Sequence, residues 1–287
     1  MTTSFSSNLT DAQRQQWDRE GYLVLPNLLP RSTIEGVRRK YAEVTDQLIG
    51  QLKAEGLIVD EGKHLPFERR LAAVAGRHAN KFGRSWRKLL GGQEVFDLQC
   101  SPGLVNVVGE LIGGDVIGHA IYNARPKLPN QQFTVVPWHQ DSGYFGAQSA
   151  TSLILTCWIP LVPVHADNGC MQVIPGTHRE SLHQHTLENC EGQFLELDAA
   201  VVDESRAVTL PMQPGDVLIF NNLVFHRSLP SISPEIRWSI DVRYVRDGDY
   251  AGDAIWPDAD FQWVIRSDAK PVTTFARWLA QVERFAW

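Results

Sequence analysis

The stretch PGDVLIFNNLVFHRS, residues 214–228, joins a turn, an apolar strand and a histidine. The Pro-Gly-Asp triplet at 214–216 is a turn signal, and the β-branched and aromatic residues after it favour a strand that ends near His226. Similar segments, rich in β-branched and aromatic residues, recur between about residue 115 and residue 246 and are separated by turn signals such as Asn168-Gly169. No helical segment long enough to be a regular crossover lies between them, so the pattern predicts a jelly roll rather than a doubly wound sheet.

The other expected strands come from seven runs rich in β-branched and aromatic residues. In chain order they lie within YLVLP (22–26), VIGHAIYNA (116–124), QFTVVPW (132–138), SLILTCWIPLV (152–162), MQVIPGT (171–177), RAVTLPM (206–212) and RWSIDVRYV (237–245).

The first third of the chain carries helix signals. Thr10 and Gln13 form a capping-box pattern for a helix that ends near Glu20. Ser32 and Glu35 repeat the pattern ahead of a long stretch with apolar residues at helical spacing.

The last residues, TTFARWLAQVERFAW (273–287), resemble a closing helix. We therefore expect one domain over residues 1–287, with a helical part at about 1–114, a jelly-roll core at about 115–246, and a C-terminal loop and helix at 247–287. The fold class is mainly β with flanking helices.

Composition narrows the class of partner. The chain has 287 residues, 43% of them hydrophobic. Its formal net charge of −6 gives no reason to expect nucleic acid or a membrane surface as a binding partner. The first residues lack the pattern of a secretory signal, and no stretch approaches the roughly 18 apolar residues of a membrane span. Four cysteines without a Cys-x-x-Cys spacing fit a reducing compartment. We expect a soluble, cytoplasmic protein that acts on a small molecule.

Two segments are candidates for substrate contact. The first, from Glu68 to Leu90, contains one acidic residue, Glu68, and seven basic residues. The basic residues are Arg69, Arg70, Arg77, Lys81, Arg84, Arg87 and Lys88. They could recognise a carboxylate, a phosphonate or the phosphates of a coenzyme A thioester, or simply form a solvated helix face. The second segment, VRDGDYAGDAIWPDADFQW (245–263), suits either a loop over a pocket or a surface connection.

Three histidines stand two residues before an acid, and one such pair is a candidate metal clamp. Residues i and i+2 of a strand share a face, so a His-x-Asp pair at a strand end directs an imidazole and a carboxylate to one point. His139-Gln-Asp141 follows the apolar run FTVVPW and fits that geometry, whereas the pairs at His165 and His178 lie beside turn signals and resemble loop residues.

His226 could complete the site. Two histidines and one carboxylate form the facial triad that holds non-haem Fe(II) and leaves coordination positions open. Arg237, eleven residues further on, opens a strand on which Arg237, Ser239, Asp241 and Arg243 share one face. A guanidinium there suits the distal carboxylate of a dicarboxylate, although an isolated arginine would more simply be a surface ion pair.

With these residues in this order, the sequence resembles the phytanoyl-CoA dioxygenase family of Fe(II)- and 2-oxoglutarate-dependent oxygenases. Four motifs carry the resemblance in order: WHQD (138–141), WIPLVPVHADNGCMQVIPGTH (158–178), PGDVLIFNNLVFHRS (214–228) and the arginine eleven residues after the last histidine. The resemblance runs from GYLVLPNLLP (21–30) to about Tyr244 and implies a double-stranded β-helix core.

The resemblance also implies roles for single residues. His139, Asp141 and His226 would bind iron, and Arg237 would bind the co-substrate 2-oxoglutarate. Ser228 and Trp158 match positions beside 2-oxoglutarate in the family. A further contact is expected near IYNARPK (121–127), where Tyr122 and Asn123 are the candidates.

The implied reaction is an oxygenation. Halogenases of the broader superfamily replace the metal carboxylate with a small residue, whereas Asp141 is present here. We expect O2-dependent hydroxylation of a small, preferably anionic metabolite with release of succinate and CO2. The alternatives are desaturation, epoxidation or cyclisation at the same iron centre in natural-product biosynthesis, or a non-redox, cupin-like metal-binding protein or isomerase.

Overall fold

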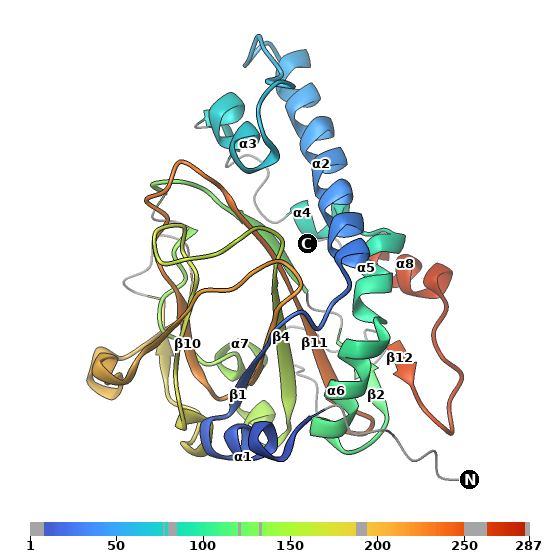
Figure 1. Ribbon diagram of the computed structural model, residues 1–287, viewed down its shortest axis with the longest axis vertical. Coiled ribbons are helices and arrows are strands. Elements are labelled where there is room, and N and C mark those ends of the chain that lie inside the picture. The colour runs from blue at the N-terminus through green and yellow to red at the C-terminus, as the bar shows by residue number, and fades with distance from the viewer. Residues whose placement is uncertain are drawn as a thin grey trace.

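A core of antiparallel strands forms one end of the molecule, and helices cover one of its faces (Figure 1). The computed structural model describes residues 9–76, 78–79, 85–119, 122–131, 134–187, 194–249 and 263–284. The α-helices are α1 (Asp11–Glu20), α2 (Arg31–Ala54), α3 (Phe67–Ala75), α4 (Ser85–Leu89), α5 (Gln93–Gln99), α6 (Pro102–Ile112), α7 (Ser142–Phe145) and α8 (Phe275–Arg284). The strands are β1 (Tyr22–Leu25), β2 (Val116–Gly118), β3 (Asn123–Lys127), β4 (Ile154–Pro160), β5 (Met171–Ile174), β6 (His185–Thr186), β7 (Glu196–Leu197), β8 (Val208–Leu210), β9 (Val217–Asn221), β10 (Phe225–Ser228), β11 (Arg237–Arg246) and β12 (Trp263–Arg266). Short 3₁₀ turns cover Ala147–Thr151, Thr177–Arg179, Ala199–Val201 and Glu204–Arg206.

Two sheets form the core. The larger has the order β1-β9-β4-β11-β2-β12, with β3 also paired to β11, and the smaller has the order β10-β5-β8. Every pairing between these strands is antiparallel, and neighbours in the sheets are often far apart in the sequence. The jelly-roll prediction is confirmed.

Strand β11 separates the helical layer from the interior. Trp238, Ile240, Val242 and Tyr244 are at most 1% exposed, and Trp238 packs against the rings of α2, α3 and α4. The alternate residues, which begin with Arg237, point to the other side of the sheet because side chains alternate along a strand. The alternation in the sequence therefore predicts correctly that one face packs on helices and the other is polar.

The N-terminal expectations are confirmed for the first helix and wrong for the start of the second. Thr10 and Gln13 form a capping box, and Gly21 ends α1 at a φ of 76°. Helix α2 begins at Arg31 with Pro30 at its N-cap and no side-chain cap, so Ser32 lies inside the first turn. Proline before the helix presets a backbone angle compatible with this earlier start.

The run QFTVVPW is not a regular strand in its described part, residues 134–138. His139 and His226 exchange two backbone hydrogen bonds of 3.0 Å, so this segment lies beside β10. A regular ladder would next use the N–H of residue 137 opposite Ser228, but Pro137 has none. The Ser228 N–H instead donates to the carbonyl of Val136 (3.0 Å).

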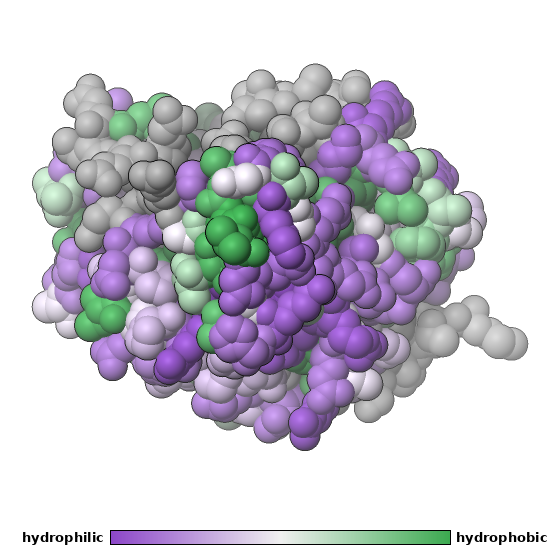
Figure 2. Space-filling view, turned by 90° about the horizontal axis from the view of Figure 1, so that it is seen from above, coloured by the Kyte–Doolittle hydropathy of each residue, from purple (hydrophilic) through white to green (hydrophobic). Residues whose placement is uncertain are grey.

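The far end of α2 projects from the core, and Leu57 and Val59 are exposed just beyond it. Figure 2 looks onto this end and shows a mainly hydrophilic surface with a small hydrophobic group near its centre.

Two surface pockets lie next to α3, and neither is lined by His139 or His226. Among the described residues, no helix has the length and apolar character needed to cross a bilayer.

Candidate active site

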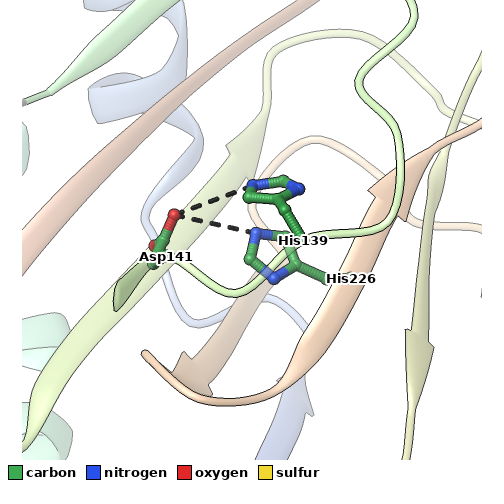
Figure 3. A group of neighbouring side chains, drawn as sticks. All are labelled: His139, Asp141 and His226. Carbon is green, nitrogen blue, oxygen red and sulfur yellow. Dashed lines mark ion pairs between the residues drawn. The ribbon is translucent and has the colours of Figure 1, made fainter. Parts of the chain in front are cut away.

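His139, Asp141 and His226 converge between the two sheets, and all three are at most 6% exposed. The Nε2 atoms of His139 and His226 lie 3.9 and 3.8 Å from the Asp141 Oδ1 atom, and dashed lines mark both approaches in Figure 3. Two metal–ligand bonds of about 2.1 Å can span such a gap, so one ion fits between these atoms. The three residues that the sequence singled out are thus brought to one point.

The route to this convergence differs from the one expected. His139 lies in a β-bridge to His226, but Asp141 has helical backbone angles, with φ −57° and ψ −34°, at the N-cap of α7. The pair therefore meets across a turn and not by the alternation of a strand. The expectation that both residues stand on a strand end is wrong.

Both imidazole rings are oriented for metal binding. Each Nδ1 lies 2.9 Å from a carbonyl oxygen, that of Pro137 for His139 and that of Val224 for His226, so each Nδ1–H donates there and leaves Nε2 free. Burial, followed by the neighbouring His226, lowers the pKa of His139 to about 3, and burial also lowers the pKa of His226. Both rings are neutral, which is the state that binds a metal.

Two residues that the sequence did not assign to the site hold Asp141. Thr156 on β4 donates its hydroxyl to Oδ2 (2.5 Å), and Arg243 on β11 donates to both carboxylate oxygens at 3.2 Å. Burial would raise the pKa of Asp141, but the Arg243 guanidinium and the hydrogen bond from Thr156 oppose it, and that pKa is lowered. The carboxylate is therefore ionised, with its Oδ1 directed at the two rings.

The residue between His139 and Asp141 fixes the turn that they share. Gln140 is fully buried, and its side-chain amide donates to the carbonyls of Ser181 (3.2 Å) and Leu223 (3.1 Å). Its backbone N–H donates to Nε2 of His185 (3.0 Å). These bonds tie the turn at His139–Asp141 to the chain segments that contain Ser181, His185 and Leu223.

Arg237 lies buried at the start of β11, with its guanidinium 5.2 Å from the ring centroid of Trp158. Its Nε and Nη1 atoms are buried without a hydrogen-bond partner among the described residues. Burial lowers the pKa of Arg237 to about 10, so the group is still a cation at neutral pH. A buried cation with two free donors is costly alone and matches a carboxylate that accepts both.

Ser228 and Lys127 stand beside this arginine. Lys127 on β3 is the register partner of Arg237, and its Nζ atom lies 2.8 Å from the Ser228 hydroxyl oxygen. Lys127 is 1% exposed. Sequence reasoning missed it, although it lies in the same short run, IYNARPK (121–127), as the two candidates Tyr122 and Asn123.

Tyr122 and Asn123 are engaged with Arg87. The Tyr122 hydroxyl donates to the Arg87 carbonyl, and the Arg87 guanidinium donates to the Asn123 side-chain oxygen at 2.6 Å. Asn123 in turn donates to Asp241 (3.0 Å), which accepts a hydrogen bond of 2.7 Å from Arg243. A chain of hydrogen bonds thus runs from Arg87 on α4 to Arg243, which holds the Asp141 carboxylate.

The remaining candidates lie elsewhere. His165 lies in a loop and His178 in a 3₁₀ turn, as expected. Of the basic segment, Arg69 and Arg70 form surface ion pairs with Glu235 and Asp46, Arg87 is buried and Lys88 is exposed. Arg77, Lys81 and Arg84, and residues 250–262 of the second candidate segment, lie outside the described residues.

Comparisons with known proteins agree with the geometry. The profile of the phytanoyl-CoA dioxygenase (PhyH) family matches residues 17–239. Human peroxisomal phytanoyl-CoA dioxygenase is 26% identical over 77% of this chain and 63% of its own length, so the chain spans less than two thirds of that relative. A probable phytanoyl-CoA dioxygenase of Caenorhabditis elegans is 24% identical over 85% of this chain and 78% of its own length. The crystal structure of EvdO2 from Micromonospora carbonacea, complexed with 2-oxoglutarate, shares the fold with a TM-score of 0.57, at 19% identity over 88% of this chain and 98% of that one.

Proposed function

The chain belongs to the phytanoyl-CoA dioxygenase family, and on that premise we propose that it is an oxygenase that uses Fe(II), 2-oxoglutarate and O2. The observation that carries the proposal is the buried guanidinium of Arg237. Its Nε and Nη1 atoms have no hydrogen-bond partner in the part of the chain that the structure describes, and Arg237 lies on the same face of β11 as Arg243, which holds Asp141. A metal-binding protein without a dicarboxylate ligand would have no use for this buried charge.

His139, Asp141 and His226 would hold the iron, which when bound supplies the activation of O2. The chain's own residues do the rest of the positioning. The Nδ1–H bonds of the two histidines fix the rings, and Thr156 and Arg243 keep the Asp141 carboxylate ionised and turned toward them. The metal ligands are thus in place before the metal arrives, which reduces the cost of binding it.

Arg237 would bind the distal carboxylate of 2-oxoglutarate, with Ser228 and Trp158 at its sides. Of the two upstream candidates, Asn123 is the better placed, because its amide borders Asp241 on the interior face of β3. Both side chains already have partners in the protein: the Tyr122 hydroxyl donates to the Arg87 carbonyl, and the Asn123 amide contacts Arg87 and Asp241.

The proposed reaction converts a substrate C–H bond, O2 and 2-oxoglutarate to a C–OH group, succinate and CO2. Asp141 supports hydroxylation over halogenation, because the carboxylate occupies the coordination position that a halide would need. A small, anionic metabolite is the proposed substrate, and residues 1–287 are proposed to act as one domain. The free thiols of Cys100, Cys157 and Cys170 support a reducing compartment such as the cytoplasm.

The test is anaerobic. Fe(II) and then 2-oxoglutarate are added to the purified protein, and the weak visible charge-transfer band of chelated iron is recorded. We expect the band to appear in the wild type and to need much more 2-oxoglutarate in Arg237→Met. If the metal binds normally and no band forms at saturating 2-oxoglutarate, the oxygenase proposal fails and the cupin-like alternative replaces it.

A further inference from the structure

Lys127 is built into the interior beside Arg237. The two residues are register partners on β3 and β11 and share a face of the sheet. The lysine stem passes so close to Gly169 that a Cβ atom there would lie 2.5 Å from the Lys127 Cε atom. A glycine is therefore required opposite this lysine, and the side chain has one defined path.

The hydrogen bonds of Lys127 match an uncharged amine. Its nitrogen lies 2.8 Å from the Ser228 hydroxyl oxygen and 2.8 Å from the Thr134 carbonyl oxygen. These two acceptors satisfy the two N–H bonds of a neutral amine, whereas an ammonium has a third N–H. Among the described residues, no carboxylate forms an ion pair with Lys127.

The electrostatics point the same way. Burial first, and the Arg237 guanidinium second, lower the pKa of Lys127 to about 6. Among the described residues, the charged or titratable groups that act on the Lys127 and Arg237 pair are Arg237 and Asp241 on β11, Tyr41 on α2 and Cys170 before β5. Burial raises the pKa of Tyr41 and Cys170, so neither one titrates near neutral pH.

We propose that Lys127 is a second cationic contact for the distal carboxylate of 2-oxoglutarate, and that it takes up one proton from solvent when the co-substrate binds. This inference rests on the proposed function. In the empty site one cation, Arg237, is present, and a second beside it would be repelled. An arriving carboxylate reverses that balance, so the amine becomes an ammonium and its third N–H gains an acceptor.

Lys127 and Arg237 together then determine specificity for a 2-oxo acid that carries a distal carboxylate. A monocarboxylate 2-oxo acid that lacks the distal group would chelate the metal equally well but would leave Lys127 neutral. The affinity for 2-oxoglutarate should then fall about tenfold for each pH step above 6, because the site must first acquire a proton. The affinity for the monocarboxylate should not follow that slope.

The experiment is calorimetric titration of the Mn(II)-loaded protein at pH 7.5 in phosphate and in Tris, two buffers with different ionisation enthalpies. The probes are 2-oxoglutarate and 2-oxobutyrate, which differ by the distal carboxylate alone. We expect an uptake of about one proton for 2-oxoglutarate relative to 2-oxobutyrate. Lys127→Met should remove that difference and weaken 2-oxoglutarate at least tenfold, while Lys88→Met, a matched change of an exposed lysine, should change neither.

Each outcome has a distinct meaning. If neither oxo acid binds the metal-loaded protein, the proposed function itself fails. If 2-oxoglutarate binds with no more proton uptake than 2-oxobutyrate, or if Lys127→Met keeps the wild-type uptake, the role of Lys127 is refuted. Should the variant fail to fold, the wild type alone decides, since an affinity for 2-oxoglutarate that is equal at pH 7 and pH 8 overturns the inference.

Discussion

Replacing Arg237 by methionine should make the empty protein more stable and the co-substrate site much weaker. Burial lowers the pKa of Arg237 from 12.5 to about 10. At about 1.4 kcal/mol for each factor of ten, the buried charge costs the folded state about 3 kcal/mol at pH 7, where both folded and unfolded states carry it. Methionine fills similar space without the charge and loses only the cation–π contact with Trp158, worth about 1 kcal/mol. We therefore expect a net gain of about 2 kcal/mol.

The same substitution removes the Nε–H and Nη1–H groups of Arg237, which would donate hydrogen bonds to the distal carboxylate. Hydrogen bonds to a charged group contribute about 1.5–3 kcal/mol each, and Lys127 and Ser228 would recover part of the loss. A remaining loss of about 3 kcal/mol corresponds to a dissociation constant for 2-oxoglutarate roughly 100-fold higher.

Thermal unfolding of the Mn(II)-loaded protein, with and without 2-oxoglutarate, measures both effects at once. The variant should melt a few degrees above the wild type when empty, and should gain little from 2-oxoglutarate at concentrations that stabilise the wild type. The reasoning is wrong if the empty variant melts below the wild type, or if its dissociation constant for 2-oxoglutarate is within threefold of the wild-type value. Calorimetric titration supplies that constant, and circular dichroism confirms the fold.

Three further predictions concern the metal ligands. His226→Ala should abolish turnover and weaken Mn(II) binding at least 100-fold with unchanged circular dichroism, and retained metal binding would remove His226 from the triad. Thr156→Val should lower metal affinity about tenfold because Asp141 loses a hydroxyl donor, with Thr156→Ser restoring most of it in the same titration. Because the pKa of His139 is about 3, its ring stays unprotonated in mild acid, so Mn(II) affinity should stay nearly flat from pH 8 to pH 5. A tenfold loss per pH step beginning near 6.5, as for an exposed histidine, would contradict this.

The triad could be predicted from the sequence because its members belong to local patterns. His139 and Asp141 are two residues apart, and His226 ends an apolar strand that a turn introduces. Such patterns depend on short-range geometry, which the sequence displays directly. The same local reasoning failed where proline intervened, at Pro30 before α2 and at Pro137 beside β10.

Thr156, Arg243 and Lys127 could not be assigned to the site in the same way. Each reaches it through pairing between strands that are distant in the sequence, such as β3 with β11 and β4 with β11. The sequence predicted which β11 residues share a face with Arg237, but not which strand would lie opposite them. Register is set by packing over the whole sheet, and only coordinates reveal it.

The alternation along β11 also bears on how the chain reaches one arrangement. If this strand slipped by one residue against its neighbours, Arg237, Asp241 and Arg243 would turn toward the aromatic layer formed with α2, and Trp238 would turn inward. Burying charges there without partners would cost several kcal/mol for each one. The polar groups that we propose to serve the reaction therefore also disfavour, during folding, any register of β11 that is shifted by an odd number of residues.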